Sequence, residues 1–198
     1  GINKSQIQHS IYDVLIGDIS LNKIILKSEE SFFDIAPANQ DLAGAEIDVV
    51  GIQDREYMLK NAINALKKSY DYILIDCPPT LNLLTVNALV AATAVLIPMQ
   101  CEYYALEGLS DLVNTIKRVK KQLNPKIEIE GLLRTLFDKR NTLAQQVSDE
   151  LSSHFGSKVY KTIIPRNVRL AEAPSHGKAA LFYDKSSKGA KAYLALAE

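Results

Sequence analysis

The feature that most constrains the fold is a repeated alternation of predominantly apolar runs with helical stretches. The apolar runs cover residues 72–75, 94–99, 127–137 and 158–165, and the stretches between them show the apolar spacing of amphipathic helices. Apolar strands separated by helices are typical of parallel strands that are buried on both faces. We therefore predict an α/β protein with an open, mostly parallel sheet, helices on both faces and right-handed crossovers.

Capping residues and apolar periodicity mark the expected helices. Ser10, followed by Asp13 three residues later, predicts a helix N-terminus with a capping-box acid. Asn141 is expected to start a helix that ends at Gly156. Three more helices are expected at residues 55–68, 83–92 and, with a serine cap, 186–198. A further helix places Leu109, Leu112, Val113, Ile116 and Val119 on one face.

Composition narrows the class of protein. No linker or repeat interrupts the 198 residues, so we expect a single domain over residues 1–198. No apolar run approaches the roughly 18 residues of a membrane span, and the opening stretch, GINKSQIQHS, lacks the form of a signal peptide. Two cysteines, Cys77 and Cys101, do not make a disulfide scaffold, and both are expected to be buried thiols. These features favour a cytoplasmic protein.

Charge is balanced overall but unevenly distributed. The chain holds 23 Lys and Arg against 23 Asp and Glu, whereas residues 156–198 hold 8 against 3. A basic segment on a neutral protein favours a polyanion-binding surface, although an ordinary solvated face explains the same count equally well.

Asp76 is the first candidate functional residue. It directly follows the apolar run 72–75 and precedes Pro78 and Pro79, which prevent the strand from continuing. In open α/β sheets, ligands bind beyond the carboxyl ends of the strands, so a carboxylate there can bind the water shell of Mg²⁺ or simply cap a loop. No G-x-x-x-x-G-K-[ST] phosphate loop is found in the chain.

Four stretches resemble the ParA/Soj-type chromosome and plasmid partition ATPases, which are deviant-Walker relatives of MinD. In chain order they are YDYILIDCPPTLNLLTVNAL, LIPMQCEYYALEGLSDLVNTI, IEGLLRTLFDKRNTLAQQV and KVYKTIIPRNVRLAEAPSHGKAALFYDKSSKGAKAYLALAE. The resemblance spans essentially the whole chain. It implies a P-loop NTPase-like fold of the SIMIBI type that here lacks the N-terminal strand and its phosphate loop, so we expect an N-terminally truncated domain.

The resemblance also implies a set of nucleotide-binding residues, with ATP and Mg²⁺ as cofactors. Asp76 matches the Walker B aspartate, which acts on Mg²⁺ through water. Pro78 and Pro79 match the switch stretch near the γ-phosphate, where Asn82 replaces a glycine common in the family. Asp138, Pro165 and Arg166 match positions around the adenine, although Pro165 taken by itself is better explained as a strand terminator.

DNA binding is the second activity that the resemblance implies. Arg140 and Arg169 match arginines that bind DNA without sequence preference, and Lys139, Arg166 and Lys178 are expected to extend the same surface. Guanidinium groups pair well with phosphate oxygens, and such binding weakens with salt.

The implied function is that of a partition ATPase. The intact protein is expected to form a homodimer with ATP, to associate with the nucleoid, to respond to a ParB-type partner and not to bind membranes. Without the phosphate loop, we expect residues 1–198 to be unable to hydrolyse ATP. Without the neighbouring strand, we expect the apolar edge at 72–75 to be exposed or mispaired and the chain to be less stable and less soluble. A non-catalytic DNA- or partner-binding module is the alternative.

Overall fold

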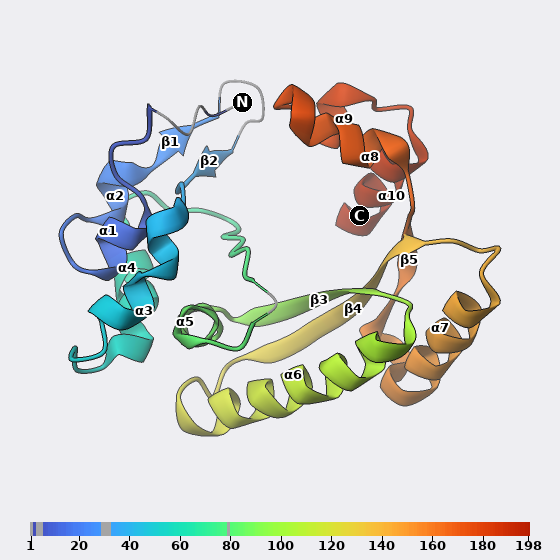
Figure 1. Cartoon of the computed structure of the whole chain (residues 1–198), viewed down its shortest axis with the longest axis horizontal. Helices are drawn as coiled ribbons and strands as arrows, with labels where there is room; N and C mark the ends of the chain where they lie inside the picture. The colour runs from blue at the N-terminus through green and yellow to red at the C-terminus, as the bar shows by residue number, and fades with distance from the viewer. Residues whose placement is uncertain (1, 3–5, 29–32, 79) are drawn as a thin grey trace. The chain divides into compact units, whose positions relative to one another are not determined.

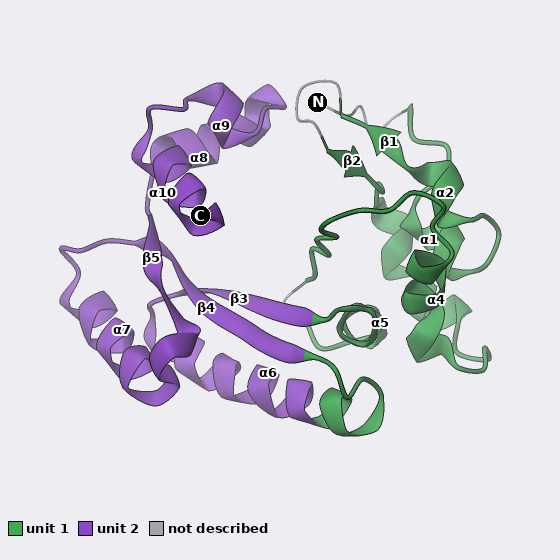
Figure 2. Cartoon of the chain, turned by 180° about the vertical axis from the view of Figure 1, so that it is seen from behind, with its two compact units in different colours: residues 1–93, 118–127 green, residues 94–117, 128–198 purple. Residues whose placement is uncertain are grey.

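The structure is a computed structural model of the whole chain, and it describes residues 2, 6–28, 33–78 and 80–198 (Figure 1). The chain forms two compact units, each built from two separate segments (Figure 2). Unit 1 contains residues 1–93 and 118–127, and unit 2 contains residues 94–117 and 128–198. A single domain over residues 1–198 therefore stays a prediction.

Unit 2 is built on a parallel three-stranded sheet in the order β3-β4-β5. The strands are β3 (Ala94–Gln100), β4 (Glu128–Phe137) and β5 (Val159–Pro165). The pairing aligns Ala94 with Glu128 and Phe137 with Pro165, so the carboxyl ends of all three strands lie along one edge. This parallel sheet confirms the predicted α/β class.

Helices lie on both sides of this sheet, as the alternation predicts. Helix α6 (Tyr103–Gln122) connects β3 to β4, and α7 (Thr142–Phe155) connects β4 to β5. Figures 1 and 2 both show α6 and α7 on one side of the strands and α10 (Lys188–Ala197) on the other, beside β5. Between β5 and α10 the chain forms α8 (Val168–Glu172), η5 (Ala173–His176) and α9 (Ala180–Tyr183), and η4 (Gly156–Lys158) precedes β5.

The core of unit 2 confirms the predicted apolar faces. On α6, Leu109 and Ile116 are buried, and on α7, Val147 and Leu151 are buried against the sheet. Gly131 allows close packing of β4, because a Cβ at this position would lie 2.5 Å from the ring of Tyr160 and 2.9 Å from a backbone oxygen of β5's entry turn. Further buried side chains of this core are Ile97, Met99, Leu132, Leu133, Phe137, Ala144 and Ile164.

Unit 1 consists mainly of short helices around two small apolar clusters. Ser10 caps its first helix, and Asp13 completes the predicted capping box. The sequence did not predict the antiparallel pair β1–β2, whose strands are only two residues long. The elements are α1 (Ile11–Leu15), α2 (Leu21–Ile24), β1 (Leu26–Lys27), β2 (Asp34–Ile35), η2 (Gln40–Ala43), α3 (Ala45–Asp48), η3 (Arg55–Tyr57), α4 (Met58–Asn64) and α5 (Leu83–Ala91).

Two buried asparagines connect the helices of unit 1. The Asn87 carbonyl oxygen, on α5, accepts a hydrogen bond from the Leu59 backbone N–H at the start of α4, at 3.1 Å. The Asn124 amide donates to the backbone oxygens of Leu89 and Ala92 at the end of α5. Each amide thus satisfies helix-end groups that have no partner within their own helix.

The prediction of a buried strand at residues 72–75 is wrong for this structure. The segment has no regular secondary structure, and Tyr72 and Leu74 are 88% and 94% exposed. A strand needs a neighbour to bond its backbone, and none of the strands in the described part of the chain pairs with this segment. The exposure expected for this apolar stretch is observed. Among the described residues, the helices are all too short or too polar to cross a bilayer.

Candidate functional site

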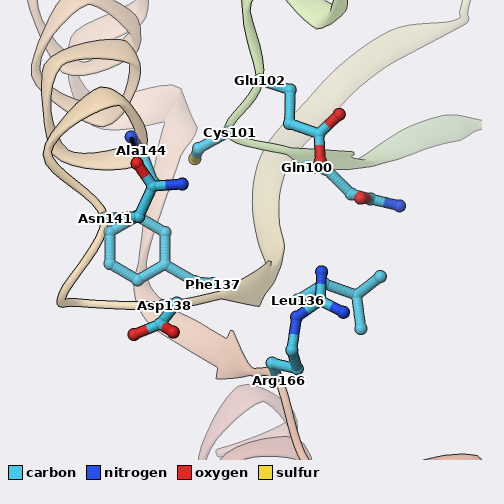
Figure 3. A pocket seen from close by; sticks show the side chains of 9 residues that line it. All are labelled: Gln100, Cys101, Glu102, Leu136, Phe137, Asp138, Asn141, Ala144 and Arg166. Carbon is cyan, nitrogen blue, oxygen red and sulfur yellow. Dashed lines mark hydrogen bonds between the residues drawn. The ribbon is translucent and has the colours of Figure 1, made fainter.

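A hollow of about 150 Å³ lies in unit 2 at the carboxyl edge of the parallel sheet (Figure 3). Each strand contributes to it: Gln100 ends β3, Phe137 ends β4, and Arg166 directly follows β5. Its polar lining consists of Gln100, Glu102, Asp138, Asn141 and Arg166, and the remaining lining residues are Cys101, Leu136, Phe137 and Ala144. This is where open α/β sheets bind ligands.

The end of β4 is irregular where it meets the hollow. Leu136 has a φ of +50°, and the register between β4 and β5 shifts between Arg134 and Phe137. A left-handed residue at such a shift is typical of a bulge, which redirects side chains near a site. The Arg166 backbone N–H donates to the Phe137 oxygen at 3.2 Å, which joins the segment after β5 to the end of β4.

The turn after β4 brings two predicted residues of different roles into direct contact. The Arg140 guanidinium donates through Nε and Nη2 to the two carboxylate oxygens of Asp138, at 3.1 and 2.8 Å. The Arg140 backbone N–H also donates to Asp138, at 3.0 Å. These bonds, together with the nearby charge of Arg166, lower the pKa of Asp138 to about 2. A residue predicted to surround adenine is therefore paired with a residue predicted to bind DNA.

Arg169 is held in a similar way by carboxylates of its own unit. Its Nη1 donates to the Glu172 carboxylate at 2.8 Å, and its Nε lies 3.5 Å from the Asp184 carboxylate. The Tyr183 hydroxyl donates to the same Glu172 oxygen at 3.2 Å, and the ring of His176 stacks on that of Tyr183. The bond from Arg169 lowers the pKa of Glu172 and raises that of Arg169.

The structure places the remaining predicted DNA-binding residues on the surface of unit 2. Lys139, Arg166 and Lys178 are all exposed. Lys139 and Arg140 lie in the turn after β4, while Arg166 and Arg169 follow β5, and these neighbouring parallel strands end along the same edge. Lys178 comes later, after η5, where its backbone N–H donates to Ala173. Arg166 belongs to both predicted sets, because it also lines the hollow.

Three other predicted nucleotide-binding residues, Asp76, Pro78 and Pro165, do not line the hollow. Pro165 is the last residue of β5, as its reading as a strand terminator predicts. Asp76 and Pro78 belong to unit 1 and are exposed, whereas Pro79 lies outside the described residues. Asn82 has a clear structural role, since its side chain caps α5 by accepting from the Thr85 backbone N–H. Among the described residues, no group of three or more His, Cys, Asp or Glu side chains is arranged to hold a metal ion.

The two cysteines differ, contrary to expectation. Cys101 is buried at the hollow, as predicted, but Cys77 is exposed, because the segment that contains it does not join the sheet. Partial desolvation and the neighbouring Asp76 charge raise the pKa of the Cys77 thiol.

Sequence reasoning missed several residues that line the hollow. Gln100, Glu102 and Leu136 were not singled out, although the first two lie at or just beyond the end of a predicted strand. The rule that ligands bind at the carboxyl ends of parallel strands is the signal that finds them.

Comparison with known proteins identifies the class of protein and then the family. The sequence profile of a family described as "AAA domain" matches residues 1–129. A solved structure of cobyrinic acid a,c-diamide synthase from Mycobacterium smegmatis with bound ADP and magnesium superposes with a TM-score of 0.82 and 34% identity, covering 98% of this chain and 71% of that chain. The matched profile and the parallel sheet place the chain among α/β proteins of the P-loop NTPase class.

Sequence relatives define the family within that class. The chain is 52% identical over 198 residues to the sporulation initiation inhibitor protein Soj of Bacillus subtilis (strain 168), covering 100% of this chain and 78% of that protein. It is 48% identical over 199 residues to the chromosome partitioning protein ParA of Caulobacter vibrioides (strain NA1000 / CB15N), covering 100% and 74%. The chain belongs to the ParA/Soj family of partition ATPases.

Proposed function

We propose that the intact protein is a DNA partition ATPase that binds ATP with Mg²⁺, dimerises, holds DNA without sequence preference and hydrolyses ATP in response to a ParB-type partner. The proposal rests on one observation, the identity of about half of all residues with Soj and ParA over the whole chain. The identity to the diamide synthase is lower, at 34%. In this role the protein acts in the cytoplasm, on the nucleoid.

The hollow of unit 2 is the proposed contact for the adenine base. A volume of about 150 Å³ is below the range of roughly 300–1,000 Å³ for pockets that enclose whole drug-sized ligands, so the hollow suits one ring system rather than a complete nucleotide. Asp138 offers hydrogen-bond acceptors, Arg166 offers donors and Asn141 offers both, while Leu136 and Phe137 supply apolar surface. The relative solved with ADP and magnesium supports a nucleotide as the ligand.

Asp76 and Pro78 are proposed to act at the phosphate end of the nucleotide. An exposed carboxylate matches a hard oxygen ligand for Mg²⁺ or its water shell. When bound, the metal supplies charge stabilisation to the phosphates. Pro79 is proposed for the same stretch from its sequence match alone.

Residues 1–198 by themselves are proposed not to hydrolyse ATP, because they contain no phosphate-loop lysine motif. A turnover assay on this polypeptide checks the proposal, and sustained phosphate release would contradict it. In a longer form of the protein that carries a phosphate loop, replacing Asp76 with Ala should abolish Mg²⁺-supported turnover. If that longer form binds DNA without any turnover, the alternative of a non-catalytic module is favoured.

DNA binding is proposed for Arg140 and Arg169, extended by Lys139, Arg166 and Lys178. All five side chains belong to unit 2, whose last 43 residues are strongly basic. Replacing Arg140 and Arg169 with Glu should weaken binding of a random-sequence duplex at least tenfold, because two attractive phosphate contacts become repulsive. Lys121→Glu with Lys126→Glu is the charge-matched control, and equal loss in both double variants would show that only net charge matters.

A further inference from the structure

Both arginines of the proposed DNA contact are already bound to carboxylates. We propose that Asp138 and Glu172 are internal competitors of DNA phosphate, which hold Arg140 and Arg169 in an autoinhibitory contact that DNA must displace. This inference rests on the proposed DNA binding and specifies how that surface is restrained.

At Arg140 the carboxylate occupies the groups that a phosphate would use. Asp138 accepts from Nε and Nη2 in a two-pronged arrangement, which is also how a guanidinium binds two phosphate oxygens. The Arg140 side chain is 91% exposed, so DNA can reach it without any rearrangement of the core. Its restraint is therefore electrostatic rather than steric.

Acidity does not relieve this restraint under ordinary conditions. Because the pKa of Asp138 is lowered to about 2, its carboxylate stays ionised well below neutral pH. Release of Arg140 needs a competing anion or a ligand group that occupies Asp138. Since Asp138 also lines the hollow, the same carboxylate faces both proposed ligands of unit 2.

Arg169 shows the same arrangement independently. Glu172 accepts from Nη1 at 2.8 Å, Asp184 lies 3.5 Å from Nε, and the Tyr183 hydroxyl donates to Glu172. The Arg169 side chain is 53% exposed, so part of it remains open to a phosphate. Two arginines on separate segments, each paired with a carboxylate two or three residues away, make the restraint a property of the surface rather than of one turn.

The expected effect is modest, because exposed ion pairs are weak. Pairs of this kind shift an equilibrium by about 1.5-fold to 5-fold. Removing one competing carboxylate should therefore tighten DNA binding by about 2-fold to 5-fold, provided that the arginine is still present.

The test is a double-mutant cycle at each pair on residues 1–198. Asp138→Asn and Glu172→Gln keep the size of the side chain and one acceptor oxygen, but they remove the charge and replace the second oxygen with an NH₂ donor. Binding to a fluorescein-labelled random duplex is followed by anisotropy at one fixed salt concentration. Asp149→Asn and Glu150→Gln, on exposed positions of α7, remove the same charges as controls. We expect the first two variants to bind more tightly than their controls, and this gain to disappear when Arg140 or Arg169, respectively, is replaced by Ala.

The outcomes separate the two ideas. If the Arg→Ala variants bind DNA as well as the unchanged chain does, the proposed DNA contact is wrong. If they bind less well, but Asp138→Asn and Glu172→Gln gain no more than the controls, the DNA contact stands and the competition is wrong. A gain that persists in the Arg→Ala backgrounds also overturns the competition.

Discussion

Asn87 offers a sharp test of how unit 1 is stabilised. Its side chain is 3% exposed, its oxygen accepts from the Leu59 N–H at 3.1 Å, and its amide donates to the Arg55 oxygen at 2.8 Å. Leu59 lies in the first turn of α4, whose amides have no partner within the helix. Asn87 therefore caps α4 from a different helix.

The variant Asn87→Leu keeps the number and branching of the side-chain heavy atoms but can neither donate nor accept. It leaves the Leu59 N–H and the Arg55 oxygen without this partner, and it excludes water better than a smaller residue would. An unsatisfied buried group lowers the free energy of unfolding by about 1–3 kcal/mol, and the Arg55 side of the contact is only partly buried. We expect a total loss of about 2–4 kcal/mol, a large part of the 5–15 kcal/mol typical of a folded domain.

Urea unfolding followed by circular dichroism measures this loss, and amide hydrogen exchange localises it to Leu59. Asn61→Leu is the matched control, because Asn61 is an exposed residue of α4, the helix that contains Leu59. Its replacement should change the free energy of unfolding by no more than about 0.5 kcal/mol. A loss at Asn87 below 1 kcal/mol, or no faster exchange at the Leu59 amide, would refute the capping argument.

Three further predictions follow from other parts of the molecule. Gly131→Ala should lower the free energy of unfolding by about 1–3 kcal/mol, because the added Cβ meets the Tyr160 ring and a backbone oxygen that cannot move aside. Thermal or urea unfolding measures this loss, and an unchanged unfolding midpoint would contradict it. The Asp138 carboxyl group, followed by NMR of its carboxyl carbon, should titrate near pH 2. The ion pair with Arg140 should therefore be fully formed above the ordinary pKa of 3.8 and lost as the pH falls through 2. Arg140→Ala should raise the titration midpoint of Asp138 toward 3.8. Leu74→Lys should reduce aggregation measured by light scattering, since it places charge on an exposed apolar segment, and Lys67→Leu on the same unit should not.

Local signals in the sequence predicted the elements of unit 2 well. Asn141 and Gly156 bound α7 as expected, and Ser187 caps α10, because caps depend on a few adjacent residues. The apolar face of α6 was predicted for the same reason, since periodicity places Leu109 and Ile116 on one side before any partner is known.

Features that depend on distant partners were not predictable in this way. Residues 72–75 have the composition of a strand, but whether they form one depends on a neighbour that the local pattern does not contain. Asn87 gave only a faint signal, a single amide in an otherwise apolar helical stretch, and its partner lies 28 residues away. In the site, Asp138 and Arg166 were found through family resemblance, whereas the pairing of Asp138 with Arg140 follows from turn geometry that spacing alone left open.

The internal carboxylates also determine how DNA binding should respond to salt. An arginine that binds phosphate normally releases a cation from DNA, and each such contact adds nearly one unit to the slope of log K against log salt concentration. When Arg140 exchanges Asp138 for a phosphate, the freed carboxylate regains a counterion, so little net release occurs at that contact. Asp138→Asn should therefore steepen the slope by about one unit while it tightens binding at low salt, whereas Asp149→Asn should leave the slope unchanged. Tighter binding with an unchanged slope would mean that Arg140 already contacts DNA without giving up Asp138, and the exchange of one anion for another would not occur.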